Sequence, residues 1–147
     1  MDLTHMTKTE DRIYLAHHPK TTVAVLRELS KDTHYVVRYH VAMNHNTPLD
    51  LLRELAKDEE YDVRSKVAYN PNTPDDILRN LVKDEAPWVR NLLVSNHKVS
   101  INILILAFEY EKNLKYPDNG VINSLYRNKK LPNFAKRVIE TLYGDWI

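Results

Sequence analysis

The segment HNTPLDLLRELAKD, residues 45–58, decides the fold, because closely related segments precede and follow it. Residues 71–84 read PNTPDDILRNLVKD and residues 19–32 read PKTTVAVLRELSKD, so the three copies begin at positions 19, 45 and 71 and define a 26-residue period. Each copy is followed by a Val-Arg pair, an apolar pair and an asparagine. Self-similarity at a fixed period of this length is the signature of a repeat protein.

The residue pattern of each unit predicts two short helices. Thr47 has the residue type that caps a helix, and Pro48 suits the first helical position, where no backbone N–H is needed. Thr73 and Pro74 repeat this pair in the next unit. Residues 49–55 then carry leucines three and four positions apart, which is the spacing of one helix face and excludes a strand.

The units are too short to fold alone. A helix of two or three turns is marginal in water, so stacking of neighbouring units must supply the core. The sequence therefore predicts an all-α fold, an α-solenoid in which residues 1–147 form one domain. Residues 11–18 are an N-terminal half-repeat, residues 19–96 are three full repeats of this period, and residues 97–147 are a divergent repeat and a C-terminal cap.

The C-terminal third departs from the pattern. Residues 101–108 are apolar on nearly all sides, which predicts a helix covered by more than one neighbour. A last helix is expected from Pro132 to about Tyr143, and its predicted inward residues are Phe134, Val138, Ile139 and Leu142. Terminal repeats cap the exposed end of a core. The alternative is self-association through the apolar helix.

The repeat resembles the variant leucine-rich repeat family and, more loosely, HEAT-type repeats. The resemblance rests on the Asn-Pro-x-Thr-Pro string of residues 70–74 and the Ile-Leu, Leu, Lys-Asp and Val-Arg positions that follow it. It implies a right-handed superhelix and leaves the second helix of each unit open between α and 3₁₀. Some members carry a cysteine-ligated iron–sulfur cluster, but this chain has no cysteine, so that property does not carry over.

The amino-acid composition excludes several kinds of functional site. Without cysteine there is no disulfide, thiolate metal site or cysteine nucleophile, and two glycines are too few for a Gly-rich phosphate loop. The longest apolar run, residues 103–108, is far shorter than a membrane helix needs. The seven histidines lack metal-binding spacing, and no serine lies in a Gly-framed turn. We therefore expect a cytoplasmic, non-enzymatic protein without a cofactor, a metal ion or a membrane partner.

The most variable positions of the second helices predict a protein-binding face. In HEAT-like stacks these helices line the concave side, and here the variable positions are rich in Tyr, His and Met, as at interface hot spots. We predict a scaffold that acts as adaptor, inhibitor or regulator. The predicted partner-binding residues are Tyr14, His17, Tyr39, His40, Met43, Lys66, Tyr69 and Leu92.

Charged residues recur at equivalent positions of the repeat and form two columns, which indicate roles other than protein binding. A basic column and the basic C-terminal end are the alternative, a nucleic-acid surface, although acidic residues share that side. Its residues are Arg27, Lys31, Arg53, Lys57, Arg79, Lys83, Lys129 and Lys130. The second column repeats an aspartate and an arginine six residues apart, and we interpret it as a structural ladder of ion pairs. Its residues are Asp32, Arg38, Asp58, Arg64, Asp84 and Arg90.

Overall fold

The computed structural model describes residues 8–147, apart from the side chain of Trp146. Within that range every regular element is a helix, so the predicted all-α class is confirmed. The helices are α1 (Thr9–His17), α2 (Val23–Leu29), α3 (Tyr35–Met43), α4 (Leu49–Leu55), α5 (Tyr61–Tyr69), α6 (Asp75–Leu81), α7 (Pro87–Ser95), α8 (Ile101–Lys112), α9 (Asn119–Arg127), α10 (Asn133–Tyr143) and a short 3₁₀ helix, η2 (Gly144–Trp146).

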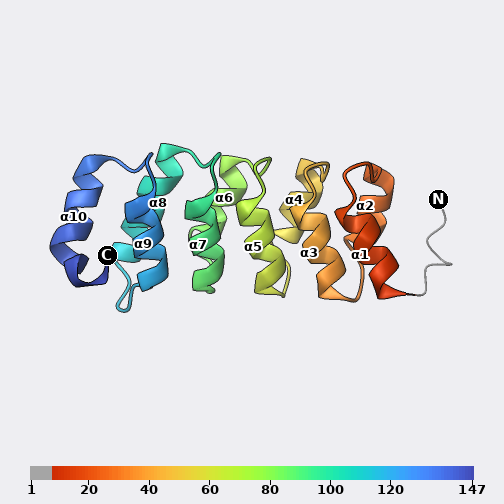
Figure 1. The fold of residues 1–147 in the computed structure, drawn as a ribbon, viewed down its shortest axis with the longest axis horizontal. Helices are drawn as coiled ribbons and strands as arrows, with labels where there is room; N and C mark the ends of the chain where they lie inside the picture. Colours follow the sequence, from red (N-terminus) through yellow and green to blue (C-terminus); the bar gives the residue numbers. More distant parts are fainter. Residues whose placement is uncertain (1–7) are drawn as a thin grey trace.

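The helices lie in two adjoining rows that follow the chain from one end of the molecule to the other (Figure 1). The odd helices α1, α3, α5, α7 and α9 are nine-residue α-helices, and each packs against the next. The seven-residue helices α2, α4 and α6 connect them and make far fewer direct contacts with one another. The starts of α3, α5 and α7, at residues 35, 61 and 87, are evenly spaced, whereas α9 begins at 119, six residues later than that spacing predicts.

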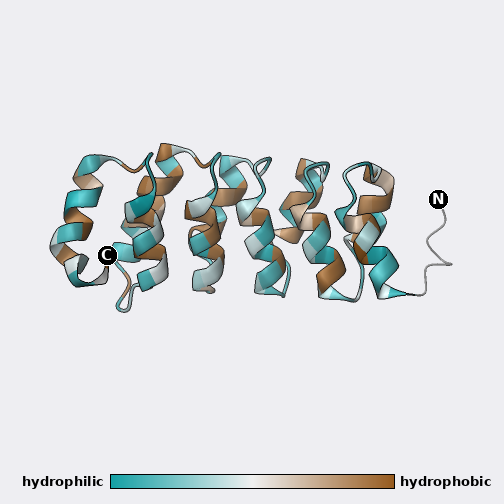
Figure 2. Ribbon diagram, in the orientation of Figure 1, coloured by the Kyte–Doolittle hydropathy of each residue, from teal (hydrophilic) through white to brown (hydrophobic). Residues whose placement is uncertain are grey.

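One hydrophobic cluster joins the two rows and extends from Ala16 to Ile139. Hydrophobic and hydrophilic residues alternate along each helix (Figure 2), and most of the aliphatic side chains are buried in this cluster. Leu52 of α4 and Val67 of α5 are both fully buried in this cluster. Because burying such a side chain contributes about 1.5–3 kcal/mol, packing between helices stabilises units that are too short to be stable alone.

The predicted threonine caps are wrong. α4 begins after Pro48, and the buried Thr47 hydroxyl donates a hydrogen bond backward to the Val41 carbonyl. Thr73 does the same with the Val67 carbonyl at 2.6 Å. These hydroxyls add a second hydrogen bond to carbonyls near the C-terminus of the preceding odd helix, which also accept from the backbone N–H groups of Asn44 and Asn70. Side-chain caps lie one position later, where a unit lacks the proline: Thr22 and Ser100.

The C-terminal helices differ partly from expectation. α8 buries Ile103, Leu104, Ala107 and Phe108, but Ile101 is half exposed. In α10 the inward assignment of Phe134 and Leu142 is wrong, since both side chains are more than half exposed. Ile139 is buried as predicted, Val138 is half-buried, and Ala135 is the other buried residue of this helix. The reason is that α10 ends the row and packs against α9, so only a narrow side of it is covered.

Candidate functional site

Buried ion pairs connect successive odd helices. The Arg38 guanidinium in α3 donates through Nε and Nη2 to Asp58 at 2.7 and 2.8 Å, and through Nη1 to the Asp32 carbonyl at 2.9 Å. One unit later, Arg64 pairs with Asp84 at 2.7 and 3.0 Å and donates to the Asp58 carbonyl at 2.8 Å. These guanidiniums have their hydrogen bonds within the protein, so the Asp/Arg column holds helices together and offers no phosphate ladder.

The first aspartate and the last arginine of this column, Asp32 and Arg90, are also paired, each with a residue outside the column. Burial raises the pKa of the Asp32 carboxyl, but hydrogen bonds from Arg12 and the His34 amide, together with the charge of Arg12, outweigh it and lower that pKa. At the other end Arg90 pairs with the buried Glu111, which sequence analysis missed. The signal was weak because this carboxylate is a glutamate one residue beyond the repeat position of Asp84, which Tyr110 occupies in the last unit.

An asparagine ladder, whose role sequence analysis also missed, ends the odd helices. Asn70 is buried, and its Nδ2 donates to the Ala42 and Asn44 carbonyls at 2.8 and 3.2 Å, while its Oδ1 accepts from the Asn72 N–H at 2.9 Å. Asn44 and Asn96 make the equivalent bonds one unit before and after. The recurrence of one asparagine per unit was the available signal, and its amide donates two hydrogen bonds through Nδ2 while it accepts one through Oδ1.

The eight predicted partner-binding residues all belong to odd helices and are at least partly accessible. We call the solvent side of α1, α3, α5 and α7 that carries them the odd-helix face. Tyr14, His17 and Tyr69 are exposed there. His40 contacts the rings of His17 and Tyr39 at centroid distances of 5.5 and 5.1 Å, and Lys66 Nζ lies 5.0 Å from the Tyr39 ring. The structure thus brings residues of α1, α3 and α5 into one surface.

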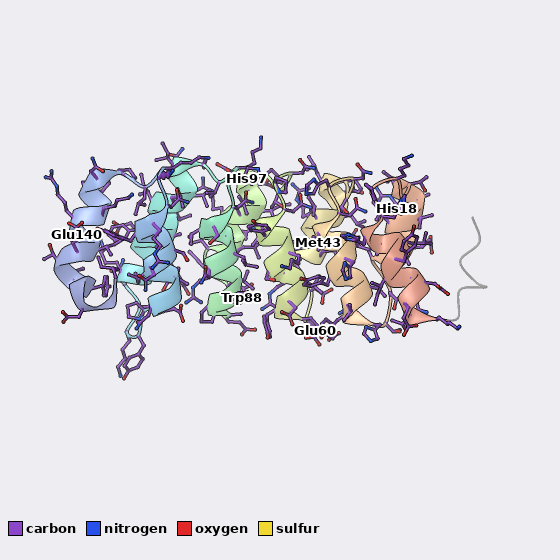
Figure 3. All side chains as sticks on the ribbon, viewed as in Figure 1. His18, Met43, Glu60, Trp88, His97 and Glu140 are labelled. Carbon is purple, nitrogen blue, oxygen red and sulfur yellow. The ribbon has the colours of Figure 1, made fainter. Side chains whose placement is uncertain are left out.

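A groove of about 610 Å³ lies at the C-terminal ends of the odd helices. Its lining residues are His17, Pro19, Met43, Asn44, His45, Asn46, Lys66, Tyr69, Asn70, Pro71 and His97. Of the eight predicted residues it contains His17, Met43, Lys66 and Tyr69, whereas Tyr14, Tyr39, His40 and Leu92 lie outside it. Figure 3 shows Met43 in the middle of the odd-helix face, with His97 at its upper edge.

The loop residues of the groove were not predicted. Pro19, His45, Pro71 and His97 share one position of the repeat and occupy the turn that follows each odd helix. The sequence shows that these four residues share a position of the repeat. It does not show that the turns lie beside the helix ends, because that depends on how the helices pack. The lining mixes aromatic, thioether, imidazole and amide groups and includes no carboxylate. Such a surface suits an uncharged or weakly acidic protein segment.

His40 is the unusual titratable group of this face. Its Nδ1 is buried and has no hydrogen-bond partner among the described residues. Burial lowers the pKa of His40, and the nearby His17 and Lys66 lower it further. The folded protein therefore keeps His40 neutral at pH values where the unfolded chain, with a histidine pKa of about 6.5, already binds a proton.

We expect the free energy of unfolding to fall as the pH drops from about 7.5 through about 6.5, because protonation of His40 then favours the unfolded chain. The fall should cease below the lowered pKa of His40. His40→Phe keeps an aromatic ring and removes the titration, so part of this pH dependence should disappear. Urea unfolding of both proteins at about pH 7.5 and 5.5 measures the difference. Identical pH dependence in the two proteins would contradict the assignment.

The arginines of the basic column lie near the C-terminal ends of α2, α4 and α6, its lysines lie in the loops that follow, and carboxylates lie among them. Arg27 pairs with Asp50 across one unit boundary, and Arg53 pairs with Asp76 at 2.7 Å across the next. The remaining members, Arg79, Lys31, Lys57 and Lys83, are exposed, as is Lys129. Lys130 Nζ donates to the carbonyls of His97 and Val99 at 2.9 and 3.1 Å. The column is therefore a mixed charged surface and not a continuous positive line.

Among residues 8–147, no three His, Asp or Glu side chains converge in the way a metal ion requires. The same part of the chain contains no helix with the length and apolar character needed to cross a bilayer. Comparison with protein-family models finds no matching family, and neither the curated proteins nor the solved structures include a significant match to this chain.

Proposed function

We propose that this chain is a short right-handed α-solenoid that binds another protein through the odd-helix face and acts as a non-enzymatic adaptor, inhibitor or regulator. Recurrence of the same contacts from unit to unit supports the solenoid. Arg38 and Arg64 make equivalent ion pairs, and Asn44 and Asn70 make equivalent hydrogen bonds, each displaced by one repeat. The variant leucine-rich repeat and HEAT-type families, which the sequence resembles, have this kind of architecture.

The packing of the two rows supports placing the odd helices on the concave side. Successive odd helices contact one another closely, whereas successive even helices make few direct contacts. In a curved stack the inner row follows the shorter path, so its members lie closer together. Concave surfaces of repeat proteins are extended binding surfaces.

The observation that carries the proposal is the groove. Tyr69 and Met43, whose residue types are enriched at protein interfaces, line it together with two prolines, and its lining includes no carboxylate. Nucleic-acid binding has less support. Two of the arginines in its column are already paired with carboxylates of the next unit, and phosphate contacts need free cations.

Substitution of His17→Ala and Tyr69→Ala together should reduce capture of the partner protein at least about tenfold, because hot-spot residues each contribute more than about 1 kcal/mol to binding. Both side chains are exposed, so their removal should leave the fold intact. The measurement is affinity capture from native lysate with quantitative mass spectrometry, with and without nuclease. Circular dichroism checks that the variant is folded.

The matched control is Tyr116→Ala, because Tyr116 is the most exposed tyrosine and lies outside the groove. It should capture the same protein as the wild type. Capture that the double substitution leaves unchanged would place the binding surface elsewhere. Loss of all captured protein after nuclease treatment would instead support the nucleic-acid alternative.

A further inference from the structure

A second cavity lies at the opposite edge of the odd-helix face. It has a volume of about 620 Å³ and is lined by Tyr61, Asp62, Ala86, Pro87 and Trp88, at the N-terminal ends of α5 and α7. Figure 3 shows Trp88 and Glu60 at this lower edge, with His18 and His97 at the upper edge. Two of the lining residues are aromatic, and both are about half exposed: Tyr61 at 46% and Trp88 at 52%.

The local folding explains why these rings face solvent. Val63 and Val89 of the same helices are fully buried, so the first turn of each helix presents its other side outward. Pro87 stands at the start of α7, where its fixed backbone angle is compatible with a helix. An aromatic pair of this size left exposed beside a cavity indicates a contact surface.

The surroundings of this cavity are acidic. Asp62 is part of the lining, and the preceding loops carry Glu60 and the almost fully exposed Glu59 and Glu85. Glu59 and Glu85 lie 3.6 Å from Arg38 and Arg64, whose closer carboxylate contacts are with Asp58 and Asp84. The other cations in the two loops are Lys57 and Lys83. The carboxylates of these loops and helix ends therefore outnumber the cations beside them, and the charge around the two rings is net negative.

We propose that this cavity, the aromatic–acidic slot of Tyr61, Asp62 and Trp88, binds a lysine or arginine side chain from a basic segment of the partner. The inference rests on the proposed function, since it names the chemistry of the protein that the odd-helix face binds. A cation over the face of a Trp or Tyr ring is attracted by the ring quadrupole, and a neighbouring carboxylate adds a charge-assisted hydrogen bond. Arginine is the better ligand because its planar guanidinium also stacks on the ring.

Other occupants fit less well. An acidic segment would be repelled by Asp62 and the three glutamates. A purely apolar side chain would cover the rings but would also take Asp62 out of water without a partner, which is unfavourable. Charge complementarity therefore selects a basic segment.

The test uses the full chain with Trp146→Phe, which leaves Trp88 as the sole tryptophan and fluorescent reporter. The probes are acetylated tetra-arginine amide and a matched tetra-glutamate peptide at low ionic strength. Tetra-arginine should change Trp88 fluorescence saturably, and tetra-glutamate should not. By calorimetry, Trp88→Ala and Asp62→Asn should each weaken tetra-arginine binding by about 3- to 30-fold, whereas Tyr116→Ala should leave it unchanged.

Absence of tetra-arginine binding, or binding that Trp88→Ala and Asp62→Asn leave intact, would contradict the proposal that the slot binds a cationic side chain. Retention of affinity in Trp88→Phe would support a stacked cation, because phenylalanine keeps a π face. The two proposals fail separately. If the slot binds tetra-arginine but His17→Ala/Tyr69→Ala does not affect partner capture, the result contradicts the proposed function. If His17→Ala/Tyr69→Ala abolishes partner capture but tetra-arginine does not bind, the result contradicts the proposed slot.

Discussion

Replacing Arg64 with methionine should lower the free energy of unfolding by about 3–5 kcal/mol, because it removes one partner of a buried ion pair. The Asp84 side chain is only 6% exposed and receives two hydrogen bonds from Arg64, so the substitution leaves a buried carboxylate without its cation. The Asp58 and Glu59 carbonyls lose a donor as well. Urea denaturation followed by circular dichroism measures the loss, which is a large share of the roughly 5–15 kcal/mol typical of a domain.

The matched control is Arg53→Met. Arg53 pairs with Asp76 across a unit boundary in the same way, but both side chains are more than half exposed and screened by water, so the expected cost is much smaller than that of Arg64→Met. The double substitution Arg64→Met/Asp84→Leu removes the charge on both sides and should recover part of the lost stability. Equal effects of Arg64→Met and Arg53→Met would contradict the structural role of the buried pairs.

Asn70→Asp should lower the free energy of unfolding by about 2–6 kcal/mol, since two buried carbonyls each lose a donor at about 1–3 kcal/mol. The shape of the side chain hardly changes, and the oxygen that accepts from the Asn72 N–H is kept. The Nδ2 group that donates to Ala42 and Asn44 is replaced by an oxygen that faces their carbonyls. Thermal and urea unfolding at neutral pH measure the effect.

Asn72→Ala is the control for this prediction. Asn72 also donates to a carbonyl of the preceding unit, that of His45 at 2.7 Å, but the bond is exposed and water replaces it. Its removal should cost less than about 1 kcal/mol. If Asn70→Asp were as mild as Asn72→Ala, the buried asparagines would not be the connections between units that their hydrogen bonds indicate.

The helices and the core could be predicted from the sequence because both depend on local patterns. The leucines of residues 49–55 lie at helical spacing, and Leu51, Leu52 and Leu55 are buried as that spacing requires. The wrong predictions concern a polar side chain with two possible hydrogen-bond partners and an apolar side chain near the end of the fold. Thr47 could cap its own helix or satisfy a carbonyl of the preceding one, and Phe134 could face inward only if a further helix covered α10.

The candidate site was only half predictable. His17, Met43, Lys66 and Tyr69 were found because variable positions of a repeat are free of packing duties, and they line the groove. The loop residues that complete it, His45 and His97 among them, come next to these side chains only through the stacking of units. Glu111 could not be assigned to Arg90, because Tyr110 occupies the repeat position of the aspartate and the carboxylate lies one residue later, on α8.

By itself the sequence determined the helical content and the side chains available for the core, since both follow from spacings of a few residues. The tertiary structure alone decided which carboxylate each arginine pairs with, which carbonyls the asparagines bind and where the groove and the slot open. Those contacts join residues about one repeat apart, such as Arg64 with Asp84 and Asn70 with Ala42. Their partners are chosen by how one unit packs on the next, which no local pattern specifies.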